Sequence, residues 1–239
     1  MFALLSGTGL LPGTADFPVA GEPVVALPLA FDAVAITVGA LSGALHATRK
    51  ELSVIGVLLV ALATGLGGGL IRDVVLERGT PAILTNPYYL LFAAVGSLVG
   101  FFFARRARNW TWAYEALDVG TLGVWVLLGC QKSIAAGLPA IGAVFVGVLA
   151  AVGGGLIRDV LCGDVPSALR PGQWLAFAAL LASITYVWMN RLDTPVYVDE
   201  VTTLAVASFL RFAAIRWDIR TPMPLDLSAR LARPADASS

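Results

Sequence analysis

Residues 67–74 read GGGLIRDV, and residues 153–160 read GGGLIRDV again. Each copy follows a long apolar stretch, and the two copies lie 86 residues apart. The same offset pairs Asp32 with Asp118 and Gly43 with Gly129. Chance does not produce an eight-residue identity within such a regular pattern, so the sequence predicts a duplicated structural unit.

The composition predicts that this unit lies in a membrane. Of the 239 residues, 58% are hydrophobic and 13% are charged, and the mean hydropathy is +0.82, whereas a soluble domain carries about a quarter charged residues. The formal net charge is +0, so no basic excess suggests a nucleic-acid partner.

Seven stretches are long enough to cross the roughly 30 Å of bilayer hydrocarbon, for which about 20 apolar residues are needed. The second and fifth are the clearest, because residues 52–71 and 138–157 contain no charge. The predicted spans are 29–47, 52–76, 88–104, 116–136, 138–161, 173–189 and 198–215.

Three spans in each copy have a geometric consequence. An odd number of crossings makes the second copy enter the membrane from the opposite side, which relates the halves by an axis in the membrane plane. We therefore expect an all-α polytopic membrane protein with seven transmembrane helices, arranged as a 3+3 inverted repeat plus one helix. The expected organisation is a lead-in (1–28), a first repeat (29–104), a basic loop (105–115), a second repeat (116–190), a seventh helix (191–217) and a disordered cytoplasmic tail (218–239).

The distribution of Lys and Arg predicts the orientation. With the N-terminus outside, most basic residues fall in cytoplasmic segments, as the positive-inside rule requires. Aromatic residues near the span ends, including Tyr88 and Tyr89, support the boundaries as interfacial anchors. We expect a multi-pass protein of the cell (inner) membrane with a cytoplasmic C-terminus.

Each glycine inside a helix costs about 1 kcal/mol relative to alanine, so Gly67, Gly68 and Gly69 need a justification, as do Gly153, Gly154 and Gly155. Small residues permit close helix packing, and a kink or break exposes backbone carbonyls to a pathway. Because a triple glycine exceeds what packing requires and runs on into charged residues, we favour the kink.

The charged end of each motif is the second candidate feature. Charges within a span are normally paired or face water, although arginines at span ends also extend to the headgroups. Our hypothesis pairs Asp32 with Arg72 near one surface and Asp118 with Arg158 near the other. Asp73, Asp159, Thr64 and Lys132 complete the candidate pathway residues.

The sequence gives little support for metal binding, cofactor binding or catalysis. Cys130 and Cys162 are the only cysteines and His46 the only histidine, so no metal site is expected. A histidine at the end of an apolar run is more often hydrogen-bonded within the protein or facing the lipid headgroups than catalytic. No GxxxxGK[ST] motif or catalytic constellation occurs, so neither a cofactor nor an enzyme activity is expected.

The GGGLIRD motifs, the matching halves and the extra seventh span resemble the prokaryotic trimeric intracellular cation (TRIC) channel family, also labelled as putative glycine transporters. The resemblance covers about residues 29–216. It implies a homotrimer with a pore in each subunit, lined by kinked second and fifth helices, and monovalent cation flux, chiefly of potassium and also of sodium. The lysine-containing motif of animal members is absent from the second helix, so their regulation is not implied.

Three functions remain open at this point. A passive cation channel accounts for the inverted repeat and the acidic residues at both ends, and we favour it. An alternating-access carrier of a small amino acid such as glycine uses the same architecture. A structural membrane scaffold is the third, since fold alone does not determine function.

Overall fold

The computed structural model describes residues 29–77, 79–107, 111–170, 174–192 and 194–217, and all regular structure within these ranges is helical. The predicted lead-in (1–28) and tail (218–239) lie outside the described residues. The long helices are α1 (Leu29–Arg49), α2 (Val54–Leu76), α4 (Pro87–Ala107), α5 (Thr111–Ala135), α6 (Ala140–Leu161), α7 (Leu175–Arg191) and α8 (Val196–Arg216). Two short ones are α3 (Ala82–Thr85) and the 3₁₀ helix η1 (Ser167–Leu169).

Each predicted span corresponds to one long helix, and the sequence explains where the central ones begin and end. The Ser53 hydroxyl accepts a hydrogen bond from the Gly56 amide at 3.2 Å and caps the start of α2. α6 begins directly after Pro139. Proline has no backbone N–H, and the start of a helix tolerates this because no intrahelical hydrogen bond is lost there. Glu77 ends α2 in the left-handed conformation (φ 50°).

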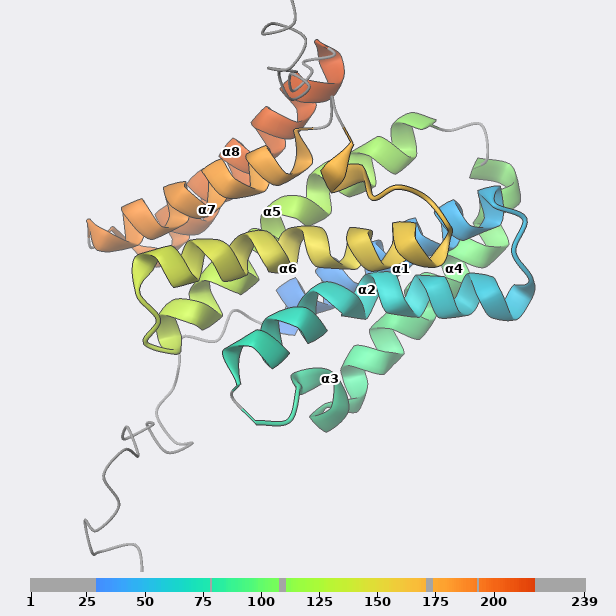
Figure 1. Cartoon of the computed structure of the whole chain (residues 1–239), viewed down its shortest axis with the longest axis horizontal. Coiled ribbons are helices and arrows are strands. Elements are labelled where there is room, and N and C mark those ends of the chain that lie inside the picture. The colour runs from blue at the N-terminus through green and yellow to red at the C-terminus, as the bar shows by residue number, and fades with distance from the viewer. Residues whose placement is uncertain (1–28, 78, 108–110, 171–173, 193, 218–239) are drawn as a thin grey trace, which may run out of the picture.

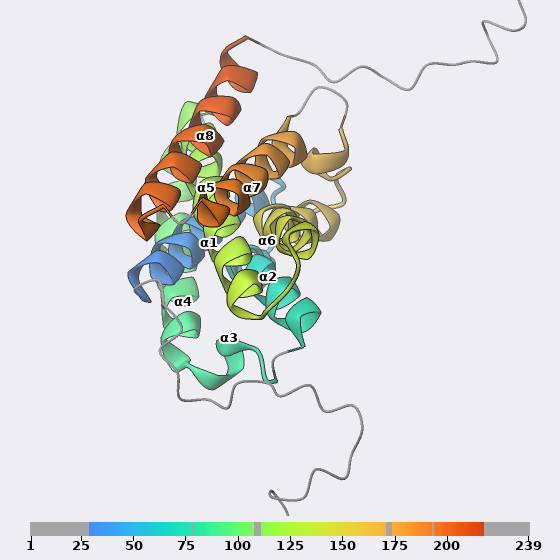
Figure 2. The ribbon, with the colours of Figure 1, turned by 90° about the vertical axis from the view of Figure 1, so that its left-hand side faces the viewer.

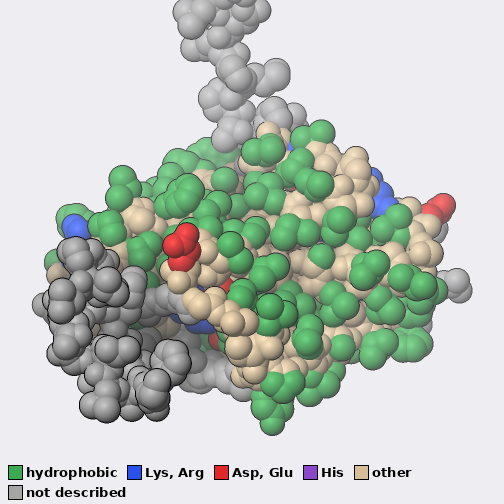
Figure 3. Space-filling view, turned by 60° about the horizontal axis from the view of Figure 1, so that its bottom comes forward, with side chains coloured by type: hydrophobic (Ala, Val, Ile, Leu, Met, Phe, Trp, Pro, Cys, Tyr) green, Lys and Arg blue, Asp and Glu red, His purple; other side chains and the backbone are tan. Residues whose placement is uncertain are grey.

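Among the described residues, three helices are long and apolar enough to cross a membrane on length and composition alone: α1, α2 and α6. α2 and α6 reach a mean hydropathy of 2.3, and α4 and α5 carry shorter apolar stretches, Pro87–Phe103 and Val119–Ala135. Large apolar side chains also cover the outer surface, including Ile141, Phe102 and Ile55, which are 82%, 73% and 71% exposed. Hydrophobic atoms accordingly dominate the described face in Figure 3, as expected for a surface that contacts lipid.

The two motif-bearing helices lie side by side at the centre of the molecule and run in opposite directions (Figures 1 and 2). α1 and α4 complete the first three-helix unit around α2, and α5 and α7 complete the second around α6. α8 packs against α5 and α7 (Figure 2). The structure thus has the predicted architecture of two inverted three-helix units and a seventh helix.

The helix contacts are built from small residues, which let membrane helices approach closely. Several alanines are completely buried between the helices: Ala35, Ala40, Ala44, Ala143, Ala150, Ala178, Ala179 and Ala182.

Candidate functional site

The glycine runs of α2 and α6 face each other, and their contacts repeat with the offset of the sequence. A Cβ atom added to Gly67 would lie 2.7 Å from Cδ1 of Ile157, and one added to Gly153 would lie 2.7 Å from Cδ1 of Ile71. As the residue number rises along one helix it falls along the other, so the helices are antiparallel. The two octapeptides therefore end on opposite sides of the molecule.

Gly68 and Gly154 permit the closest approach. A Cβ on Gly68 would collide with the carbonyl oxygen of Ala150, and one on Gly154 would collide with that of Thr64. Both obstacles are backbone atoms, which cannot move without shifting a whole helix. Glycine at these two positions is therefore required by packing.

Close packing therefore justifies glycine at these two positions. α2 and α6 are each one α-helix through the glycine run, and the kink stays a prediction. A single sequence does not reveal which helix faces the glycines, so only the structure identifies the packing partner.

Arg72 and Asp73 form a clamp that joins the end of α2 to the next segment. Nε of Arg72 donates to Oδ1 of Asp73 at 2.8 Å, and Oδ2 of Asp73 accepts from the backbone amide of Ala82 at 3.0 Å. Arg72 is 1% exposed, so it does not extend to the headgroups. The carboxylate thereby fixes the start of α3 beside α2.

The second motif builds the same clamp. Nε of Arg158 donates to Oδ1 of Asp159 at 2.8 Å, and Oδ2 of Asp159 accepts from the amide of Ser167 at 2.7 Å, at the start of η1. Arg158 also donates through Nη1 to the hydroxyl of Ser42 at 3.4 Å. Ser42 belongs to α1, so this contact joins the two halves of the chain.

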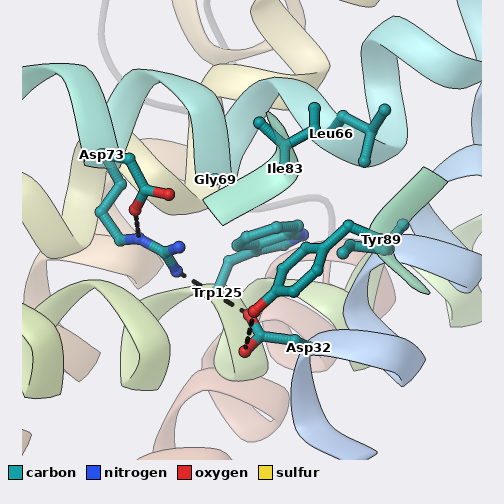
Figure 4. Close-up of a pocket in the computed structure, with 9 residues that line it drawn as sticks. Asp32, Leu66, Gly69, Asp73, Ile83, Tyr89 and Trp125 are labelled. Carbon is teal, nitrogen blue, oxygen red and sulfur yellow. Dashed lines mark hydrogen bonds and ion pairs between the residues drawn. The ribbon is translucent and has the colours of Figure 1, made fainter. Parts of the chain in front are cut away.

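Asp32, which our hypothesis pairs with Arg72 near one surface, lies beside that arginine. Oδ1 of Asp32 is 4.0 Å from Nη1 of Arg72, and Oδ2 accepts a hydrogen bond from the hydroxyl of Tyr89 at 2.9 Å (Figure 4). Tyr89 is buried, so its predicted place in an interfacial aromatic belt is wrong. Nothing in the sequence pattern distinguishes it from Tyr88, which is 56% exposed. The side chain of Asp118 lies outside the described residues, so its pairing with Arg158 stays a prediction.

Two hollows adjoin this network. The smaller, of about 10 Å³, has room for about one water molecule and is lined by Asp32, Ile36, Leu66, Gly69, Arg72, Asp73, Ile83, Tyr89 and Trp125. The larger, of about 310 Å³, is lined by Asp73, Leu76, Gly79, Thr80, Ala82, Thr85, Lys132 and Ala135. Asp73 lines both hollows.

Of the two predicted wall residues, Lys132 lines the wider of these two hollows. Thr64 is buried, its hydroxyl donates to the Val60 carbonyl at 2.6 Å, and neither hollow includes it. It lies instead where α1 packs on α2: a Cβ on Gly43 would be 2.5 Å from its hydroxyl oxygen. Thr64 thus contributes to the packing of α1 on α2, and its role in a pathway wall stays a prediction.

A charged cluster ties the end of α1 to the loop after α6. Oδ2 of Asp164 lies 3.0 Å from Nε2 of His46, and Oδ1 lies 2.6 Å from Nζ of Lys50. Hydrogen bonds from Lys50 and His46 lower the pKa of Asp164 from its usual value. His46 thus has a hydrogen-bond partner in Asp164.

The two cysteines form no disulfide. Cys130 is buried and Cys162 partly buried, and both are free thiols. Within the described chain, no three His, Cys, Asp or Glu side chains come together as a metal site.

These features define a class: polytopic helical membrane proteins with an inverted three-helix repeat and an additional helix. A family model described as Glycine transporter matches residues 29–105 and 115–191. The second match begins and ends 86 residues after the first, which is the offset of the octapeptides. The chain belongs to this family, whose solved members include TRIC channels.

Relatives match over most of the chain. The UPF0126 inner membrane protein YadS of Escherichia coli K12 is 33% identical over 80% of this chain and 93% of its own length. A UPF0126 membrane protein of Deinococcus radiodurans is 31% identical over 80% and 89%. The TRIC trimeric intracellular cation channel orthologue from Rhodobacter sphaeroides superposes with a TM-score of 0.76 at 30% identity, covering 80% of this chain and 98% of that one. The protein is accordingly a multi-pass membrane protein.

Proposed function

We propose that this protein is a channel that conducts monovalent cations, chiefly potassium, through a pathway along α2 and α6 in each subunit. The cation-channel description of structurally similar proteins supports the proposal. The observation that carries it is a pair of hollows that share Asp73 in their linings, the narrower of which is also lined by the carboxylate of Asp32 from α1.

The electrostatics of the wider hollow favour a cation. Leu76 ends α2 and Ala135 ends α5, and both line this hollow. The C-terminal ends of helices carry partial negative charge, which adds to the carboxylate of Asp73. Lys132 offsets part of this field, so in our proposal it tunes the cation flux.

Arg72, Asp32 and Tyr89 form the closed gate of the proposed pathway. Oδ1 of Asp32 and Nη1 of Arg72 are buried, and neither makes a hydrogen bond within the described chain. These two atoms keep unused hydrogen-bonding capacity for water or a passing ion. Separation of Tyr89 from Asp32 would widen the narrow hollow. Arg158, with Asp118, is proposed to act likewise at the other end.

Assembly and orientation belong to the same proposal. We infer a homotrimer in the inner membrane, with the N-terminus outside and the C-terminus in the cytoplasm. The trimeric description of the Rhodobacter sphaeroides protein and the inner-membrane name of YadS support this.

The decisive experiment is single-protein recording in a planar bilayer under a potassium chloride gradient. Unitary current steps that reverse near the potassium equilibrium potential are expected. Uptake of labelled glycine into proteoliposomes serves as the parallel measurement. Saturable glycine accumulation without unitary currents would overturn the channel in favour of a carrier.

One observation supports the carrier as second candidate. The wider hollow presents the carboxylate of Asp73 and the ammonium group of Lys132, which together complement the amine and carboxylate of a small amino acid. The label of the family model agrees with this reading. A carrier would lose uptake on Lys132→Gln, whereas a channel would keep its unitary currents with altered amplitude.

A further inference from the structure

The seventh helix carries a buried carboxylate that the proposed pathway does not use. Asp199, in the first turn of α8, is 0% exposed, and Thr203, one turn further, is also 0% exposed. α8 packs against α5 and α7 (Figures 1 and 2). Neither residue lines the hollows beside α2.

The polar atoms around Asp199 are only partly satisfied. Oδ1 accepts a hydrogen bond from the hydroxyl of Thr194, which also lies 2.9 Å from the carbonyl oxygen of Met189. Oδ2 of Asp199 has no hydrogen-bond partner within the described chain, and neither has the hydroxyl of Thr203. None of the described Lys, Arg or His side chains forms an ion pair with Asp199.

In its ionised form, such a carboxylate requires a positive partner. A buried charge is strongly unfavourable unless it is paired or coordinates a metal. The N-terminal end of α8 offsets only part of that cost, because helix-end charges are partial. Charged residues inside membrane proteins are accordingly rare and mark functional sites.

The two unpartnered oxygens lie on one face of α8. Residues four apart on a helix are neighbours, about 6 Å between Cβ atoms. A carboxylate oxygen and a hydroxyl oxygen at this spacing reach a single ion between them. The last turn of α7, which contains Met189, points its negative end toward the same region.

We propose that Asp199 and Thr203 bind an alkali-metal cation, sodium or potassium, between α8 and α7. Oxygen ligands suit hard cations, and transporters hold sodium with carboxylates and helix-end carbonyls. One buried carboxylate neutralises one positive charge, so a monovalent ion fits and a divalent ion leaves an excess. Glu200 is the next residue but is partly exposed, and Tyr186 of α7 is the other titratable group near Asp199. The ion stabilises the attachment of the seventh helix.

The test measures thermal unfolding of the full-length protein in detergent, in sodium or potassium chloride against N-methyl-D-glucamine chloride at equal ionic strength. Above the dissociation constant, each tenfold rise in the free cation concentration should raise the ratio of folded to unfolded protein by up to tenfold. The melting temperature of the wild type should therefore rise with the logarithm of the cation concentration. Equal melting curves in all three salts, or stabilisation by added magnesium chloride but by neither alkali salt, would overturn the proposal.

Variants assign the effect to this site. Asp199→Asn should abolish the cation dependence, and Thr203→Val should weaken the apparent affinity at least tenfold while leaving the carboxylate in place. Glu200→Gln is the matched control, since it removes the adjacent carboxylate and should keep the dependence. Asp32→Asn should also keep it, because Asp32 belongs to the proposed pathway. If Asp199→Asn does not fold, an unchanged cation dependence in Thr203→Val is sufficient to contradict the site.

Discussion

At the scale of single residues, Asp73 and Asp159 have a role that their position in a charged motif does not reveal. Each binds the arginine before it and also the backbone amide that begins a short helix after the span. The Arg-Asp pair therefore positions a loop as well as carrying charge. Asp32 is different, because its Oδ1 atom keeps an unused hydrogen-bonding position next to Arg72.

Tyr89→Phe should favour the open pathway. The change removes the hydroxyl that donates to Asp32 at 2.9 Å and leaves the ring in place. A hydrogen bond to a charged group contributes about 1.5 to 3 kcal/mol, so the ratio of open to closed time should rise roughly tenfold or more in bilayer recordings. Tyr88→Phe is the matched control and should behave as wild type, because Tyr88 is largely exposed. An unchanged open probability in Tyr89→Phe would exclude this hydrogen bond from gating.

Asp164→Asn should reduce stability near neutral pH and should have little effect in strong acid. Hydrogen bonds from Lys50 and His46 lower the pKa of Asp164 below its usual value of 3.8. A carboxylate with a lowered pKa contributes stability above its unfolded-state pKa, and the contribution disappears as the pH falls through the folded-state pKa. Since the cluster is partly exposed to solvent, the effect at pH 7 should be below about 1 kcal/mol.

Thermal melting of wild type and Asp164→Asn at a series of pH values measures this difference. The curves should converge below pH 3.8. The Lys50→Gln variant, alone and combined with Asp164→Asn, isolates the pair. Fully additive effects of the two substitutions would show that the salt bridge contributes nothing.

At the scale of helices, the central contact is between the antiparallel helices α2 and α6, which pack closely because glycines lie at their interface. The sequence predicted that these helices carry the function, but it did not reveal that the glycines meet the backbone of the opposite helix. Gly68 and Gly154 face carbonyl oxygens, whereas Gly155 faces only the distant end of Arg158, 3.9 Å from an added Cβ. Adjacent positions in one motif therefore tolerate very different substitutions.

Gly154→Ala should destabilise the protein and impair transport, and Gly155→Ala should not. The added methyl group on residue 154 collides with the Thr64 carbonyl and forces α2 and α6 apart, which typically costs about 1 to 3 kcal/mol for an overpacked contact. Alanine at residue 155 meets only a flexible side-chain end and gains helix propensity. Melting temperature and ion flux, measured on both variants, provide the comparison. Equal stability of the two variants would mean that the helices are not held at the distance described.

At the scale of the whole molecule, the duplication determines how the chain crosses the membrane. α2 and α6 run in opposite directions, so the ends of the two octapeptides emerge on opposite surfaces. The cluster of His46, Lys50 and Asp164 agrees with this, because it joins the end of α1 to the end of α6. In the proposed channel, the inverted repeat would give the pathway a related entrance on each side.

Cysteine accessibility tests this topology directly. The native thiol of Cys162 follows α6. The substitution Glu77→Cys, made in a Cys162→Ala background, places a thiol after α2. Cys130 is buried and should stay unreactive in both proteins. A membrane-impermeant maleimide should label residue 77 from the periplasmic side and Cys162 only in inside-out vesicles. Labelling of both positions from the same side would contradict the inverted arrangement.

The sequence by itself determined the duplication, the seven spans and the opposite directions of the motif helices. These depend on identity, on hydropathy and on the parity of three crossings, which are properties of a linear chain. It also brought Asp32 and Arg72 together, because both were assigned to the same depth. Burial of both motif arginines followed from the cost of an unpaired charge in lipid.

Only the tertiary structure decided which face of each helix meets a neighbour. The orientation of the helices determines that Gly68 and Gly154 meet the backbone of the opposite helix, that Tyr89 is buried next to exposed Tyr88, and that Ser42 contacts Arg158. It also placed Asp199 in the interior, although its sequence position near the start of α8 resembles an exposed helix end. Rotation about a helix axis is fixed by contacts between distant segments, and for helices as uniformly apolar as these the local pattern does not encode it.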